Sequence, residues 1–200
     1  MKRLIHMMLI DFDGTIVDLW ARYHAVFCRL TGAQIDQQQY KVAKQQYKRD
    51  EDLARYFGLL LPSDYFTRKA LLLEDPQYLA LDRLLLPGEK LLRFMAQQDA
   101  KILTARRYPE NLLWELNNLG LSALQNRVIC TNEPKVKWVA AHAAGKGYII
   151  GDDVRDLQTI TVSNLDSVMV QTGLCTPADF SKTGLRYELV QTLEEFIDRG

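Results

Sequence analysis

The stretch Met7-Met8-Leu9-Ile10-Asp11-Phe12-Asp13-Gly14-Thr15 decides how this chain folds. A near-continuous apolar run is typical of a strand buried in a parallel sheet, so we expect a strand over Leu4–Ile10. Because side chains alternate along a strand, Asp11 and Asp13 point to the same side. Gly14 then allows the chain to turn sharply, close to whatever the two aspartates hold.

The two aspartates follow the end of this strand, at a place that suits chemistry. In open α/β sheets, ligands bind beyond the carboxyl ends of the strands. Two like charges at this spacing repel each other, so we expect a cation, most simply a divalent metal ion, between Asp11 and Asp13.

The composition fits one globular core with a smaller insertion. The chain has 200 residues, of which 48% are hydrophobic, with 25 basic and 25 acidic residues. Zero formal net charge argues against nucleic acid or an anionic membrane as the main partner. We find no run of about 20 apolar residues, so no membrane span is expected.

The compartment is predicted from the cysteines and from the first residues. Three cysteines without CxxC spacing suggest thiols in a reducing compartment. The basic start Met1-Lys2-Arg3 resembles a signal peptide, but the apolar run ends in aspartates without a small-residue cleavage site. We therefore expect a cytoplasmic protein.

Strand patterns alternate with helix patterns in the second half of the chain. Such alternation predicts right-handed βαβ units, and hence an α/β fold with a doubly wound, mostly parallel sheet. The further expected strands are Lys101–Leu103, Arg127–Cys130, Tyr148–Ile150 and Ser167–Val170. The expected helices are Glu89–Gln98, Pro109–Leu119, one from Pro134 to Gly145, and Leu189–Ile197.

The residues between Leu19 and Arg83 show helical but no strand patterns. We therefore expect a small helical insertion over residues 19–83 and a core made of residues 1–18 and 84–200. Within the insertion, Asp36–Tyr56 is polar and rich in Gln and Lys, which indicates an exposed helical hairpin.

Polar clusters follow three of the expected strands. They come after Ile10, after Leu103 as Thr104-Ala105-Arg106-Arg107, and after Ile150 as Gly151-Asp152-Asp153-Val154-Arg155-Asp156. In a parallel sheet all three clusters fall at the same edge, which is a stronger signal than any one of them.

Together these motifs resemble those of the haloacid dehalogenase superfamily, mainly its phosphatases. The resemblance covers Leu4–Asp18 and about Leu84–Val170, and the insertion stands where that family carries its first type of cap. It implies a Rossmannoid core whose first strand is central, with Arg127–Cys130 and Ser167–Val170 outermost among the expected strands.

The resemblance also implies roles for the acids. Asp11 is the expected nucleophile, forming an aspartyl-phosphate, and Asp13 the expected acid and base. Asp11, the main-chain carbonyl of Asp13, and Asp152 are the expected ligands of Mg²⁺, at about 2.1 Å. Asp156 is expected to hold a metal-bound water or to orient a ligand, and Asp153 is the alternative to Asp152.

Four residues are expected to bind substrate. The resemblance implies that Thr104 binds the phosphate, with Ala105 and Arg106 beside it, in a form that resembles members acting on nucleotides or related phosphates. Arg106 can equally be a solvated residue at a helix start. Lys135 and Lys137 both qualify as the lysine that contacts the phosphate, and we prefer Lys135, which stands at the helix start beside Pro134.

The start of the insertion allows two interpretations. Trp20, Tyr23 and His24 can line a substrate cavity, or they can form an aromatic stripe in the core of the first helix, which we favour.

The prediction is a Mg²⁺-dependent phosphoric monoester hydrolase acting on a small phosphorylated metabolite. The presence of Asp13 counts against a dehalogenase. A phosphomutase on the same scaffold and a non-enzymatic partner-binding protein are the alternatives. Phosphonate hydrolysis ranks lower, because its lysine can only be sought by composition, among Lys41, Lys44, Lys48 and Lys69.

Overall fold

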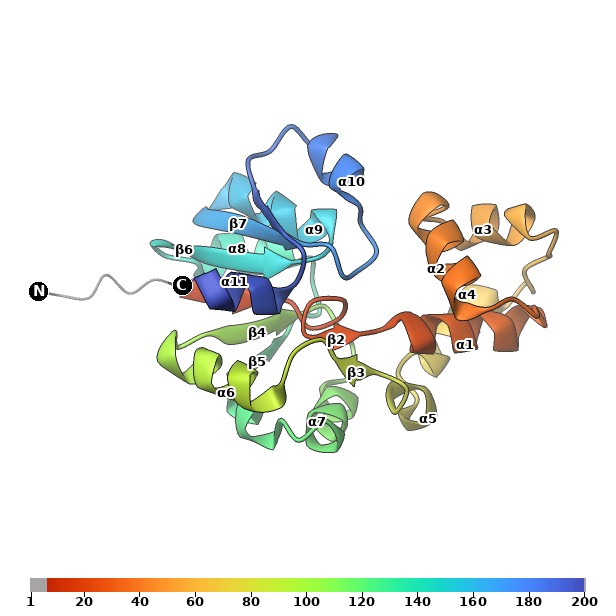
Figure 1. Ribbon diagram of the computed structural model, residues 1–200, viewed down its shortest axis with the longest axis horizontal. Helices are drawn as coiled ribbons and strands as arrows, with labels where there is room; N and C mark the ends of the chain where they lie inside the picture. Colours follow the sequence, from red (N-terminus) through yellow and green to blue (C-terminus); the bar gives the residue numbers. More distant parts are fainter. Residues whose placement is uncertain (1–6, 200) are drawn as a thin grey trace, which may run out of the picture. The chain divides into compact units, whose positions relative to one another are not determined.

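A computed structural model describes residues 7–199 of the chain (Figure 1). Leu4 to His6, expected in the first strand, lie outside the described residues. The chain divides into two compact units: the residues up to Asp18 together with those from Leu84 onward, and Leu19–Arg83. A two-stranded sheet of β2 (Val17–Asp18) and β3 (Arg83–Leu84) stands where the chain passes from one unit to the other.

The first unit contains a parallel sheet, six-stranded within residues 7–199 (Figure 1). Its order is β5 (Val128–Cys130), β4 (Lys101–Thr104), β1 (Met7–Ile10), β6 (Lys146–Gly151), β7 (Asn164–Val170) and β8 (Glu188–Val190), and each neighbouring pair is parallel. The predicted α/β class is thereby confirmed, as is the order of the five expected strands.

Helices cover both faces of this sheet. They are α6 (Gly88–Gln97), α7 (Pro109–Asn118), α8 (Lys135–His142), α9 (Val154–Leu157), α10 (Pro177–Ser181) and α11 (Leu193–Arg199), with 3-10 helices over Ser122–Arg127 and Gln158–Val162. Met8 and Ile10 of β1 pack with α6, α7 and α11, whereas Leu9 packs with Val139 of α8 on the other face. This division follows from the alternation of side chains along a strand.

The expected helix over Leu189–Ile197 was wrong at its start. Leu189 and Val190 pair with Met169 and Val170 of β7, and α11 begins only at Leu193. The edge of β7 offers backbone groups that a further strand can pair with, and a three-residue strand is too short to show an alternating pattern.

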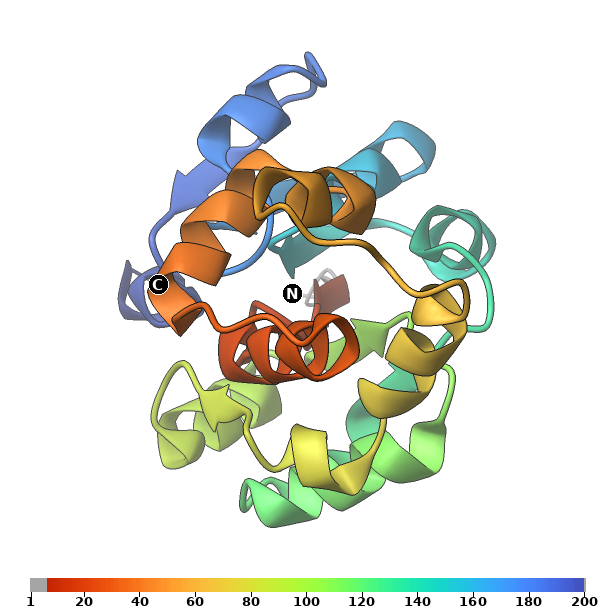
Figure 2. The same cartoon turned by 90° about the vertical axis from the view of Figure 1, so that its right-hand side faces the viewer.

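The second unit consists of helices. They are α1 (Trp20–Thr31), α2 (Gln37–Gln46), α3 (Asp50–Tyr56), α4 (Tyr65–Leu72) and α5 (Pro76–Leu79), coloured red to yellow in Figure 2. Helix α1 packs against α2, α4 and α5. Trp20, Phe27, Tyr40 and Leu53 are almost completely buried between them.

The expected helical hairpin over Asp36–Tyr56 forms as α2 and α3, and its outer residues are exposed, but the expectation missed two buried charges. Lys44 and Asp50 are buried, and Asp50 accepts hydrogen bonds from Lys44 Nζ at 2.6 Å and Lys69 Nζ at 2.5 Å. Tyr65 also donates its hydroxyl to Asp50, at 3.0 Å. Lys44 and Asp50 can be buried because each is paired with an opposite charge inside the unit.

Within the described residues, no helix is both long enough and apolar enough to cross a membrane.

Candidate active site at the carboxyl edge of the sheet

The backbone brings the acids of two strands together. Strand β1 pairs in parallel with β6, and the N–H of Asp11 extends this pairing by donating to the carbonyl of Ile150 at 2.8 Å. Asp11 therefore lies beside the end of β6, where Asp152 and Asp156 follow. Oxygen atoms of these three buried carboxylates all lie within 4.8 Å of one another.

Glycines make room for this cluster. A Cβ atom on Gly14 would stand 2.6 Å from Asp152 Oδ2, and Gly14 has a left-handed φ of 79°. A Cβ on Gly173 would overlap the carboxylate of Asp152, and one on Gly151 would overlap that of Asp156. The two carboxylates are thus held in a cradle that only glycine leaves open.

The segment after β7 completes the cradle, and our sequence analysis missed it. Leu174 donates its N–H to Asp152 Oδ2 at 3.0 Å, and Thr172 donates its hydroxyl to the carbonyl of Gly14 at 2.5 Å. The signal was present, because Gln171-Thr172-Gly173 follows a strand at the same edge as the other polar clusters.

Lys135 lies in the middle of the acids. It is the first residue of α8, and its Nζ lies 2.6 Å from both Asp11 Oδ1 and Asp156 Oδ1. Lys135 is buried, whereas Lys137 is exposed. The structure thus brings Lys135 to the predicted site and leaves Lys137 at the surface.

Burial and charge shift the pKa values in this cluster. Burial raises the pKa of Asp11 to about 7, although the ammonium of Lys135 opposes the shift. Burial and the charges of Asp11 and Asp156 raise the pKa of Asp152 well above its usual range. Burial favours the neutral form of Lys135, but the two carboxylates beside it raise its pKa overall.

The cluster fits a metal ion. Three buried carboxylates face one ammonium, so negative charge is in excess at a place where an unpaired charge is costly. A divalent cation would relieve that excess, and carboxylate oxygens are the ligands that hard cations prefer. Asp11, Asp152 and Asp156 can therefore hold a metal ion.

Asp153 has a different task from its neighbour Asp152. Its side chain caps α9 by accepting the N–H of Arg155 at 2.8 Å, and it also accepts Arg155 Nε at 2.9 Å. Burial alone would raise the pKa of Asp153, but Arg155 holds it below its usual value. The structure thus places Asp152 in the carboxylate cluster and Asp153 at the helix start.

Asp13 lies outside the carboxylate cluster, paired with an arginine. Arg106 donates Nε to Asp13 Oδ2 at 2.8 Å and Nη2 to Asp13 Oδ1 at 2.6 Å. Arg106 is buried, so the interpretation of Arg106 as a solvated residue was wrong. Ligation of a metal by the main-chain carbonyl of Asp13 stays a prediction.

The remaining expected phosphate ligands lie in the same loop. Thr104, the last residue of β4, is buried, and its hydroxyl accepts the N–H of Arg106 at 3.4 Å. Ala105 is exposed. Their binding of substrate stays a prediction.

In the helical unit, the aromatic residues of α1 contribute to its core. Trp20 packs edge-on against Tyr40, with ring centroids 6.5 Å apart, and His24 Nε2 lies 2.7 Å from the carbonyl oxygen of Ile35. Tyr23 is half-buried, with Lys69 Nζ 5.5 Å from its ring centroid. These contacts agree with the core interpretation, and a role in lining a cavity stays a prediction.

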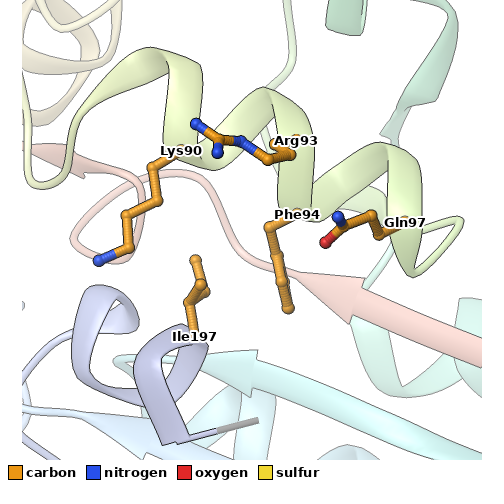
Figure 3. Close-up of a pocket in the computed structure, with 5 residues that line it drawn as sticks. All are labelled: Lys90, Arg93, Phe94, Gln97 and Ile197. Carbon is orange, nitrogen blue, oxygen red and sulfur yellow. The ribbon is translucent and has the colours of Figure 1, made fainter.

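A hollow of about 280 Å³ lies elsewhere, between α6 and α11 (Figure 3). It is lined by Lys90, Arg93, Phe94, Gln97 and Ile197. None of these is a predicted site residue, and Lys90 is already paired with Glu194 and Asp198, so we assign no function to this hollow.

Comparison with known proteins identifies the fold. No protein-family model matches the sequence, and no curated protein matches it. A haloacid dehalogenase-like family hydrolase from Streptococcus pneumoniae superimposes with a TM-score of 0.69 over 98% of both chains, at 15% identity. The resemblance predicted from the motifs is confirmed at the level of the fold.

Two further solved structures are similar. A haloacid dehalogenase family hydrolase from Deinococcus radiodurans, solved with bound phosphate and sodium, has a TM-score of 0.63 and 15% identity, over 95% of this chain and 92% of that one. Protein Tyrosine Kinase A from Mycobacterium tuberculosis has a TM-score of 0.69 and 17% identity, over 98% of both chains.

Proposed function

We propose that this chain, whose α/β fold is that of the haloacid dehalogenase-like hydrolases, is a Mg²⁺-dependent phosphatase that hydrolyses a small-molecule phosphate monoester. One observation carries the proposal. Lys135 bridges Asp11 and Asp156 inside a buried cluster of three carboxylates, at the edge of the sheet where ligands bind.

Asp11 is the proposed nucleophile. Its Oδ1 accepts from Lys135 Nζ at 2.6 Å and from the N–H of Phe12 at 2.7 Å, and these two donors fix the rotation of the carboxylate. An oxygen of Asp11 attacks phosphorus and forms an aspartyl-phosphate, while the ester oxygen leaves. Lys135 contributes positive charge beside the transferring group.

Mg²⁺ is the proposed ion, held by Asp11, Asp152 and the main-chain carbonyl of Asp13. When bound, it would offset the charge of the incoming phosphate and keep the carboxylates ionised. The phosphate recorded in the Deinococcus radiodurans structure supports phosphate as the group recognised by this fold.

Asp13 is the proposed acid and base. It protonates the leaving oxygen in the first step and accepts a proton from the attacking water in the second. Thr104, Ala105, Arg106 and Lys135 are the proposed contacts to substrate, and a nucleotide or a sugar phosphate is the proposed substrate class. We propose a small phosphorylated metabolite as the partner, in place of nucleic acid or a membrane. A cytoplasmic location is also part of this proposal.

The first experiment measures phosphate release from 4-nitrophenyl phosphate with and without Mg²⁺. We expect activity that needs Mg²⁺ and that Asp11→Asn abolishes. Asp166→Asn, at an exposed aspartate of β7, is the matched control and keeps the wild-type rate. Full activity in Asp11→Asn would refute the nucleophile assignment.

The second experiment seeks the intermediate and the product. Borohydride reduction of acid-quenched enzyme converts an aspartyl-phosphate into homoserine, which peptide mass analysis should locate at position 11. A phosphomutase would form the same intermediate, so the products from a hexose 1-phosphate separate the two activities. We expect free phosphate, and an isomeric sugar phosphate instead would favour the mutase.

A further inference from the structure

The guanidinium of Arg106 donates hydrogen bonds to two carboxylates from different parts of the core. Nε and Nη2 donate to the two oxygens of Asp13, and Nη1 donates to Glu115 Oε2 at 2.5 Å. Asp13 follows β1, whereas Glu115 lies on α7 and is completely buried. A chain of ion pairs thus runs from a helix, through Arg106, to the proposed acid of the site.

The geometry of this chain restrains Asp13. A guanidinium that donates in parallel to both oxygens of a carboxylate fixes the plane of that carboxylate as well as its distance. Arg106 is restrained in turn, because Glu115 holds its far side and the ring of Phe12 lies beneath it, with the ring centroid 5.1 Å from Cζ. Arg106 and Glu115 are buried, and burial of a charge is costly unless it is paired, which maintains the arrangement.

We propose that Arg106 is a positioning residue that orients Asp13 for proton transfer, and that Glu115 anchors Arg106. This inference rests on the proposed phosphatase activity. It differs from the expectation that Arg106 binds substrate, because three of its five N–H groups, one on each nitrogen, already donate to Asp13 and Glu115.

Both chemical steps need this orientation, but only the first depends on the leaving oxygen of the ester. Asp11 forms a bond to phosphorus, the bond from phosphorus to the leaving oxygen breaks, and that oxygen takes the proton of Asp13. In the second step water attacks phosphorus, Asp13 takes a proton from that water, and the bond from Asp11 to phosphorus breaks, which releases phosphate. Transfer of a proton requires the two heavy atoms to approach to about 2.6–3.2 Å, so a misoriented Asp13 slows it.

The test compares two esters that differ in their need for a proton. 4-Nitrophenolate is a stable anion and leaves unprotonated, whereas the more basic phenolate of phenyl phosphate benefits from a proton as it leaves. Arg106→Lys keeps the charge but loses the planar fork. We expect kcat/KM, which reports the steps up to formation of the aspartyl-phosphate, to fall about 100-fold on phenyl phosphate but less than about threefold on 4-nitrophenyl phosphate.

A double variant shows whether Arg106 acts through Asp13. Asp13→Asn should show the same preference for the better leaving group. Adding Arg106→Lys to Asp13→Asn should cost little more, because residues that act as one unit are not additive. Glu115→Gln, which keeps the size and an acceptor for Arg106, should give the same pattern more weakly and serves if Arg106→Lys does not fold.

Three results would overturn the inference. Equal losses of kcat/KM on the two esters would mean a merely structural role, and a raised KM with unchanged kcat would make Arg106 a substrate ligand. Additive losses in the double variant would show that Arg106 does not act through Asp13. If wild-type enzyme cleaves neither ester, the proposed function itself fails, which is a different outcome.

Discussion

Lys135 Nζ lies 2.6 Å from Asp11 Oδ1, although Asp11 follows the end of β1 and Lys135 begins α8, more than 120 residues later in the chain. The contact forms because α8 begins at the same edge at which β1 ends. It makes Lys135 the main source of positive charge for the proposed nucleophile, since Lys137 on the same helix is exposed.

Replacement of the two lysines should therefore have very different effects. Lys135→Ala leaves Asp11 and Asp156 facing each other without the ammonium, so we expect the rate of phosphate release to fall at least about 100-fold. Lys137→Ala should stay within about twofold of wild type, since surface changes rarely matter. Steady-state kinetics on 4-nitrophenyl phosphate checks both, and a larger loss in Lys137→Ala would show that the wrong lysine was chosen.

Magnesium should stabilise the folded protein. Its binding relieves the excess negative charge of Asp11, Asp152 and Asp156, and a ligand at 100 times its Kd stabilises the folded state by about 2.7 kcal/mol. We expect Tm, measured by calorimetry, to rise with Mg²⁺ but not with NaCl of equal ionic strength. The rise should disappear in Asp152→Asn and persist in Asp166→Asn. An undiminished rise in Asp152→Asn would place the ion elsewhere.

Gly173 should be needed for Mg²⁺ binding, as is Asp152, whose carboxylate lies against it. In Gly173→Ala the new methyl group overlaps the carboxylate of Asp152, so that carboxylate must move. We expect weaker Mg²⁺ binding, by at least about tenfold in a calorimetric titration, which is the range seen when the support of a metal ligand is lost. Gly88→Ala is the control, because its Cβ would stand 3.4 Å from Leu84 Cδ1, close to ordinary contact. Unchanged affinity in Gly173→Ala would refute the cradle.

In the helical unit, Asp50 should be critical for stability. Asp50→Asn leaves the buried Lys44 and the adjacent Lys69 without their shared carboxylate, and removal of one partner of a buried ion pair costs about 3–5 kcal/mol. Hydrogen exchange of α2, α3 and α4 amides measures the loss within this unit. Asp52→Asn breaks only an exposed pair with Arg55 and should cost at most about 1 kcal/mol. Similar losses in both variants would contradict the burial of the cluster.

The same carboxylate predicts a dependence on pH. Burial alone would raise the pKa of Asp50, but Lys69 and Lys44 hold it below its usual value of 3.8. A carboxyl whose pKa is lower in the folded state contributes stability that is present above pH 3.8 and is lost as the pH falls through the folded value. Protection of the α2 to α4 amides from hydrogen exchange should therefore decline below pH 3.8 in wild type. In Asp50→Asn, this decline with pH should be absent.

Local patterns were sufficient for the class of fold and for the location of the candidate site. The strands before Asp11 and before Asp152 are each recognisable as buried strands from a few adjacent apolar residues. The rule that parallel strands end at a common edge then brings the two acids together without knowledge of any contact. Dependence on local patterns also explains why β8 was missed. Its three residues are too few to show a strand pattern.

Taken alone, the sequence determined the alternation of strands and helices and the edge of the sheet where acids gather, because these follow from the periodicity of neighbouring residues. The order of the five expected strands came instead from the resemblance of its motifs to a known family. Only the tertiary structure decided which charges meet: Lys135 with Asp11, Arg106 with Asp13 and Glu115, and Asp50 with two lysines. A charged side chain has the same local pattern whether it is solvated or buried in a pair. Its partner is set by how distant elements pack, and that packing is not encoded in any single stretch of the chain.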